Sequence, residues 1–159
     1  MATAQNSLLL RLPRKDRAAL LAAGESVQLA LSDVLCDAGK ATRHVYFPVD
    51  AFISMVAPID GKPALEVGMV GREGMLGAQL ALGVATVPLH AVVQGQGAAG
   101  RIASAAFRAE LARSAALQRL LNRYLYVLMA QLAGSGACLR FHEIGPRLAR
   151  WLLMSQDRA

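Results

Sequence analysis

The residues best suited to chemistry in this 159-residue chain lie in one glycine-rich turn. In the segment Gly71–Gly77, three glycines bracket one base and one acid, Arg72 and Glu73. Glycine permits positive φ angles and close backbone approach, so the N–H groups of such a turn can point at an anion. We therefore expect this turn to hold a ligand.

The two charged side chains of the turn leave alternatives open. Arg72 could point into a pocket, or it could be a solvated turn residue, which is the commoner situation for an arginine. Glu73 could contact a ligand, or it could accept backbone N–H groups and brace the turn without one.

The other reactive side chains match no enzyme or metal centre. Cys36 and Cys138 are far apart in the sequence, whereas zinc or iron–sulfur sites need about three or four soft ligands at close spacing. His44, His90 and His142 show no spacing typical of metal ligands, and no GxSxG motif marks a serine nucleophile. We expect no enzymatic activity, no bound metal and no cofactor.

Composition indicates one folded domain that does not span a membrane. Hydrophobic residues make up 55% and charged residues 18% of the chain, a balance typical of a protein with a sizeable core. No apolar run reaches transmembrane length, and the N-terminus lacks the features of a secretory signal, so we expect a cytoplasmic protein without a membrane partner. The net charge is +6, but the basic residues are scattered and form no nucleic-acid recognition element.

Hydrophobic periodicity predicts the elements around the turn. The spacing of leucines predicts helix over residues 8–24, with a second short helix opening after Pro13. Residues 26–102 show short alternating runs separated by turn signals, of which Asp60-Gly61 is a strong hairpin signal. This pattern is typical of a β-barrel or a jelly roll.

Helical periodicity returns in the last third of the chain. It predicts helices over 105–111, 114–132 and 143–156, and Gly134-Ser135-Gly136 is expected to break or loosen the long one. The long helix is apolar nearly all round, so it needs a second partner surface, and the same helix of another subunit is the simplest one. We expect a homodimer whose interface contains Leu117, Leu120, Leu121, Tyr124, Leu128, Gln131 and Leu132.

Four segments of the chain together resemble one known family. They are His44–Pro48, Val70–Gly77, Val92–Gln94 and Arg147–Leu153. With the order of helix, glycine-rich β-roll and long apolar helix, they resemble the effector domain of Crp/Fnr-type transcriptional regulators. The resemblance implies an α+β fold, in which a cyclic-nucleotide-binding-like β-roll (jelly roll) is flanked by helices and followed by a long C-terminal dimerisation helix.

On this resemblance the chain divides into four parts. Residues 1–25 form an N-terminal helical segment, 26–112 the β-roll effector domain with a short following helix, and 113–137 the dimerisation helix. Residues 138–159 begin the connection to a helix-turn-helix domain, through which alone DNA binding is expected. We expect that domain beyond Ala159, because Trp151, Leu152 and Met154 form an apolar face that otherwise lacks a partner.

The resemblance also implies a ligand site. Members that bind cyclic AMP hold its phosphate with an Arg-Ser or Arg-Thr pair and its ribose with a glutamate of the glycine turn. Glu73 matches the ribose position, but Leu89-His90 stands at the Arg-Ser position and Leu132-Ala133 at the purine contact. Losing a charge-assisted bidentate bond costs about 1.5–3 kcal/mol, or about one to two decades in affinity. The expected ligand-binding residues are Gly71, Arg72, Glu73, Gly74, Met75, Leu89 and His90.

These observations predict the signal-sensing and dimerisation domain of a Crp/Fnr-type DNA-binding regulator. Its effector would be a small molecule or a nucleotide, and cyclic AMP held by the family's phosphate contact is not expected. Two alternatives stay open. One is a ligand-free structural or interaction module with a degenerate cyclic-nucleotide-binding fold, and the other is a cupin-like metalloenzyme, which would need bound metal.

Overall fold

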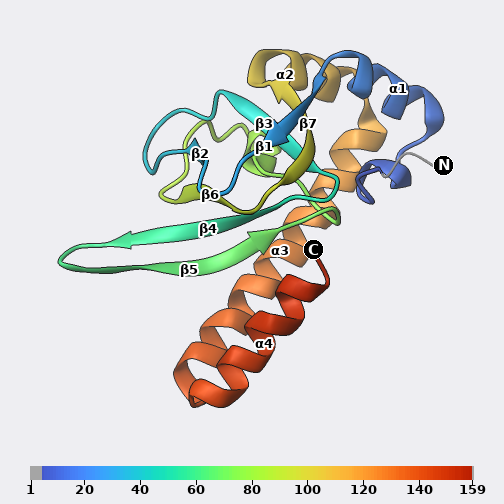
Figure 1. Ribbon diagram of the computed structural model, residues 1–159. Helices are drawn as coiled ribbons and strands as arrows, with labels where there is room; N and C mark the ends of the chain where they lie inside the picture. The colour runs from blue at the N-terminus through green and yellow to red at the C-terminus, as the bar shows by residue number, and fades with distance from the viewer. Residues whose placement is uncertain (1–4, 159) are drawn as a thin grey trace.

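Two antiparallel sheets form an open β-roll at the centre of the protein (Figure 1). The computed structural model describes residues 5–158, with the backbone alone for Lys62. One sheet has the strand order β1 (Glu25–Leu29), β7 (Gly97–Ala103), β3 (His44–Pro48). The other has the order β2 (Val34–Cys36), β6 (His90–Gly95), β4 (Phe52–Ile59), β5 (Lys62–Val70). The expected α+β roll is confirmed, as a jelly-roll-like arrangement of two sheets rather than a closed barrel.

Helices flank the roll at both of its chain ends. A 3₁₀ helix (Leu9–Arg11) and α1 (Arg14–Ala22) precede it, a 3₁₀ helix (Ala78–Leu82) interrupts it, and α2 (Ser104–Arg113), α3 (Ala115–Phe141) and α4 (Ile144–Gln156) follow it. In Figure 1, α3 passes under the roll, and α4 returns alongside α3, so that the C-terminal end of α4 approaches the C-terminal end of β5. The first four residues of the expected segment 1–25, and Ala159 of the segment 138–159, lie outside the described residues.

The strongest local sequence signals are reproduced. Gly61 has φ 66°, the left-handed conformation that a tight hairpin turn requires, and β4 pairs with β5 on either side of it. Pro13 precedes the first turn of α1, and the Ser114 hydroxyl accepts the Leu117 N–H at 3.0 Å, which caps α3. The short strand β2 was not predicted, because its three residues carry too little alternation to be distinguished from a loop.

Gly134-Ser135-Gly136 were expected to break or loosen the long helix, and the expected break does not occur. Helix α3 continues through these residues to Phe141. The Ser135 hydroxyl donates to Gln131 O at 3.0 Å and accepts from the Arg150 guanidinium of α4 at 2.9 Å. Tertiary contacts with α4 thus outweigh the low helix propensity of two glycines, a cost of about 1 kcal/mol each.

The glycine turn lies where two apolar clusters meet. Met75 belongs to a cluster beneath the helices that includes Phe47, Phe107 and Leu117, whereas Leu76 belongs to the cluster inside the roll. Leu76 also exchanges backbone hydrogen bonds with Tyr46 of β3, at 2.9 and 3.1 Å. Consecutive side chains anchored in two different cores fix the position of the turn that precedes them.

Candidate functional site

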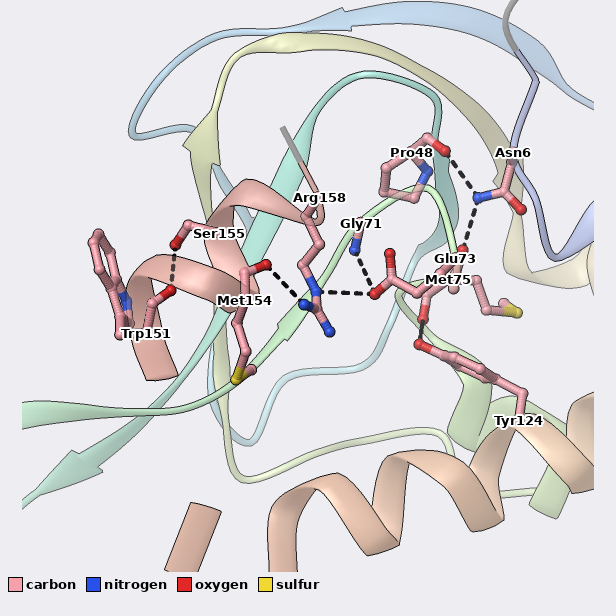
Figure 2. A network of polar contacts seen from close by, with 11 residues as sticks. Asn6, Pro48, Gly71, Glu73, Met75, Tyr124, Trp151, Met154, Ser155 and Arg158 are labelled. Atoms are coloured by element: carbon pink, nitrogen blue, oxygen red, sulfur yellow. Dashed lines mark hydrogen bonds and ion pairs between the residues drawn. The ribbon is translucent and has the colours of Figure 1, made fainter. Parts of the chain in front are cut away.

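The backbone of the glycine turn is held by α3 (Figure 2). The Tyr124 hydroxyl of α3 donates to Met75 O at 3.3 Å. Gly74 packs against the same ring so closely that a Cβ there would collide with it. Burial raises the pKa of the Tyr124 phenol, so it stays a neutral donor at physiological pH. The turn and α3 are therefore in direct contact without any ligand.

Helix α4 covers the other side of the turn. The Nε atom of Arg158 lies 3.0 Å from Glu73 Oε1, and the Arg158 Nη1 donates to Met154 O at 2.8 Å. Figure 2 shows the Arg158 side chain reaching from the end of α4 towards the Glu73 carboxylate. The side chain of Arg158 is 10% exposed and that of Glu73 is 44% exposed. A Cβ on Gly71 would lie 2.7 Å from the Arg158 side chain, so the glycine permits this close approach.

Glu73 braces the turn itself. Its Oε1 accepts the Gly71 N–H at 3.2 Å and is the same oxygen that faces Arg158. The Arg158 Nε forms an ion pair there without the alignment of a hydrogen bond, and it is buried without another partner among the described residues. One carboxylate oxygen thus serves both the turn and α4.

The N-terminal segment supports the turn from a third direction. The side-chain amide of Asn6, which is 2% exposed, donates to Pro48 O and to Gly74 O, each at 2.8 Å. The backbone carbonyl of Arg72 accepts the Ser7 N–H at 2.7 Å, whereas the Arg72 side chain is exposed. Among the described residues, the Arg72 guanidinium has no hydrogen bond and no ion pair.

A cavity of about 130 Å³ lies between the roll and α3, next to the turn. Met75, Leu89 and His90 line it. The other wall consists of α3 side chains, namely Leu125, Leu128 and Leu132. No lysine or arginine within 5–158 lines this cavity, and its size is below the range of roughly 300–1,000 Å³ that is usual for ligand pockets.

The seven expected ligand-binding residues therefore fall into two groups. Met75, Leu89 and His90 line the cavity. The other four, Gly71, Arg72, Glu73 and Gly74, lie outside its lining and face Arg158, Tyr124 or solvent. The His90 ring, whose Nδ1 lies 3.4 Å from Asp37 Oδ1, is the polar member of the first group.

Helix α4 has a second attachment, which the sequence did not indicate. The Trp151 indole N–H donates to Glu66 Oε1 of β5 at 2.9 Å, and the Ser54 hydroxyl of β4 donates to the other oxygen of Glu66. Trp151 and Glu66 are far apart in the chain, so no local sequence pattern predicts their hydrogen bond. The helix is thus tied to the β4–β5 hairpin by Trp151 and to the glycine turn by Arg158.

The expected dimer residues occupy different environments on α3. Leu117 and Leu121 are 2% and 0% exposed and lie inside the protomer's own core. Tyr124 holds the turn, Leu128 and Leu132 line the cavity, and Leu120 and Gln131 are half-buried. In its middle α3 exposes Tyr126, Val127 and Met129, at 72%, 61% and 66%, and near its C-terminal end it exposes Leu139 and Phe141, at 37% and 76%.

Two other kinds of site were sought over residues 5–158. No helix in this range is both long and apolar enough to cross a membrane. No group of three or more His, Cys, Asp or Glu side chains that could hold a metal ion occurs in the same range.

Solved structures with the same architecture are regulatory proteins. The c-di-GMP-responsive global regulator CLP of Xanthomonas campestris matches with a TM-score of 0.71 and 16% identity, over 88% of this chain and 70% of that chain. The N-terminal domain of a Streptomyces coelicolor A3(2) transcriptional regulator matches with a TM-score of 0.60 and 15% identity, over 89% and 97%. A cyclic nucleotide-binding domain from Methylobacillus flagellatus KT matches with a TM-score of 0.57 and 14% identity, over 77% of this chain and 67% of that chain.

The chain has the cyclic-nucleotide-binding-like fold. The resemblance to Crp/Fnr-type effector domains is confirmed at the level of architecture, including the long helix α3 after the roll. Identities of 14–16% show the fold alone. Comparison with protein-family models and with curated proteins finds no match to the sequence.

Within this cyclic-nucleotide-binding-like fold, the glycine turn is enclosed by the chain's own residues. Asn6, Tyr124 and Arg158 approach it from the N-terminal segment, α3 and α4 respectively. The turn is therefore in direct contact with α3 through Tyr124, and with the residues that follow α4 through Arg158.

Proposed function

We propose that this chain is the signal-receiving and dimerisation domain of a Crp/Fnr-type DNA-binding transcription regulator. The observation that carries the proposal is the position of Glu73, whose carboxylate joins the glycine turn to α4 through Arg158. A sensor needs a ligand-responsive element in contact with an output element. The turn with its adjacent cavity is the first, and α3 and α4 are the second.

The proposed coupling is a competition for one carboxylate oxygen. A ligand that gives Glu73 Oε1 a new hydrogen-bond donor takes the position that Arg158 Nε occupies. Such a ligand favours the arrangement in which Arg158 has left the turn, and differential binding of this kind is what allostery requires. Release of Arg158 frees the end of α4, and DNA binding would follow through a helix-turn-helix domain attached after it.

We propose that cyclic AMP held by the family's phosphate contact is not the effector. Leu89 and His90 supply no permanent positive charge to the cavity, and its lining is largely apolar. An enclosed phosphate monoanion without a guanidinium or enough N–H donors is costly to desolvate.

The homodimer is proposed to form along the exposed side of α3. Tyr126, Val127 and Met129 are large apolar side chains that the middle of α3 leaves in solvent, apart from Leu139 and Phe141 near its C-terminal end. Because Leu117 and Leu121 are used inside the protomer, these three residues are better candidates for the contact than the buried leucines.

A second candidate is a ligand-free module with the same fold. The cavity of about 130 Å³, which Met75 and Leu89 line, favours it, since this volume is below the range usual for ligand pockets. In that case α3 serves assembly only, and the Glu73–Arg158 contact is a permanent structural link.

Isothermal titration calorimetry with cyclic AMP, cyclic GMP and cyclic di-GMP separates the candidates. The sensor proposal predicts that one effector binds and that the fluorescence of Trp151, the single tryptophan of the chain, changes with the same midpoint. Glu73→Gln should weaken that binding, and Glu110→Gln, at a partly buried acid of α2 that pairs with Arg113, should not. Micromolar binding of cyclic AMP would contradict the statement that Leu89 and His90 disable the phosphate contact.

A further inference from the structure

A second and larger cavity lies beneath α1, away from the glycine turn. Its volume is about 370 Å³, within the usual range for small-molecule sites. It is enclosed by the N-terminal segment, α1 and the sheet β1-β7-β3, and it shares no lining residue with the cavity beside α3. The proposed effector site therefore does not account for it.

The floor of this cavity is apolar. Leu9, Leu20, Phe47 and Ile102 line it and are each at most 5% exposed. Leu21 also lines it and is 49% exposed, so apolar surface continues towards solvent. Covering that surface with an aliphatic group would remove it from water, which is favourable.

The charged groups at the cavity leave one cation without a counter-ion. Arg101 and Glu25 neutralise each other, with Nη2 and Nε of Arg101 at 2.8 and 3.1 Å from Glu25 Oε1. Arg17 lines the same cavity from α1 and has no hydrogen bond or ion pair through its guanidinium with any residue in 5–158. The cavity thus carries one uncompensated positive charge beside an apolar floor.

We propose that the cavity beneath α1 binds a small amphipathic monocarboxylate. Its aliphatic chain lies on Leu9, Leu20, Phe47 and Ile102, and its carboxylate pairs with the guanidinium of Arg17. A planar guanidinium matches a carboxylate in a bidentate arrangement, which a hydroxyl or an ammonium group cannot reproduce. Glu73 is not among the lining residues, and the cavity touches the glycine turn only through Asn6, whose amide donates to Gly74 O.

Titration calorimetry of the full chain with octanoate, 1-octanol and octylammonium tests the proposal. Octanoate should bind, octanol should bind about tenfold or more weakly, and octylammonium weakest, because only the carboxylate pairs with Arg17. Arg17→Gln should weaken octanoate about tenfold and leave octanol unchanged. Arg14→Gln, on the same exposed helix but outside the cavity lining, is the matched control and should bind octanoate like the parent chain.

A space-filling variant supplies a second test. Gly100 lines the cavity, and a Cβ there meets nothing closer than 3.8 Å, so Gly100→Val should occupy the cavity and abolish binding of both octanoate and octanol. The proposal is overturned if the parent chain does not bind octanoate at millimolar concentration. Equal octanoate affinity in the parent and Arg17→Gln would overturn it as well, because binding would then lie elsewhere.

Discussion

Arg158 Nε and Glu73 Oε1 lie 3.0 Å apart, which joins the end of α4 to the glycine turn. The two residues differ in environment, because Arg158 is almost completely buried and Glu73 is nearly half exposed. Solvent near the carboxylate keeps the pair weak enough to exchange, whereas the enclosed guanidinium gives it a defined geometry. A contact of this strength suits a link that forms and breaks.

The first prediction concerns the strength of this link. In a double-mutant cycle, Glu73→Gln and Arg158→Gln should each lower the free energy of unfolding, with a coupling energy of about 0.5–1 kcal/mol. Urea unfolding monitored by circular dichroism measures it. The coupling should shrink at high salt, since one partner is exposed. Fully additive effects of the two substitutions would show that the pair is not formed in solution.

The second prediction concerns the contact of the turn with α3. Gly74→Ala should destabilise the protein by about 1–3 kcal/mol, because the new methyl group collides with the Tyr124 ring. Gly145→Ala is the matched control, since nothing lies within 4 Å of a Cβ there, and it should be neutral or stabilising by up to about 1 kcal/mol. Thermal unfolding measures both. In a Tyr124→Leu background, Gly74→Ala should destabilise the protein much less. An equal loss of stability in that background would show that the clash is not with the Tyr124 ring.

The third prediction separates the surface of α3 from its core. Val127→Glu combined with Met129→Arg should convert a dimer to a folded monomer, because both side chains are exposed. Leu121→Ala should instead lower the free energy of unfolding by about 2–5 kcal/mol, since it opens a cavity in the protomer's core. Light scattering with circular dichroism distinguishes the two outcomes. A parent chain that is monomeric at micromolar concentration would refute the proposed dimer.

The fourth prediction is a loss of stability in alkali. Burial raises the pKa of Tyr124, the Glu73 carboxylate raises it further, and Arg158 lowers it. A phenol with a raised folded-state pKa stabilises the protein fully below the unfolded value of about 10, and this contribution disappears as the pH rises through the folded-state pKa. Urea unfolding between about pH 8 and pH 11 should show the decline, and Tyr124→Phe should make it shallower. An identical slope in both proteins would rule out Tyr124 as its source.

Local signals predicted the elements better than the contacts between them. The Asp60-Gly61 hairpin and the α3 cap at Ser114 depend on residues that are neighbours in the sequence, so the local sequence was enough to predict them. The path of α3 through Gly134 depends on α4, which periodicity along one helix cannot reveal. For Glu73 the sequence left ligand contact and bracing equally open. The hydrogen bond from the Gly71 N–H to Glu73 Oε1 shows that Glu73 braces the turn.

The partner of Glu73, which follows α4 in the chain, could not be foreseen. By sequence position alone Arg158 is one of 17 scattered lysines and arginines, and only the return of α4 along α3 brings it to the turn (Figure 1). In the same way, the spacing of Leu117 and Leu121 fits a dimer interface, but both are already buried in the protomer's own core, among residues of the roll, the N-terminal helices and α2. Helical periodicity identifies an apolar face without saying which surface buries it.

Acrylamide quenching of Trp151 fluorescence tests the central claim most directly. This single tryptophan lies on α4, so its accessibility reports whether α4 is attached. If Glu73 and Arg158 hold α4 to the turn, Glu73→Gln and Arg158→Gln should both raise the quenching constant. Arg119→Gln, at an exposed arginine of α3 outside the cavity that Trp151 lines, should leave it unchanged. Quenching that is the same in all four proteins would contradict the coupling of the glycine turn to α4.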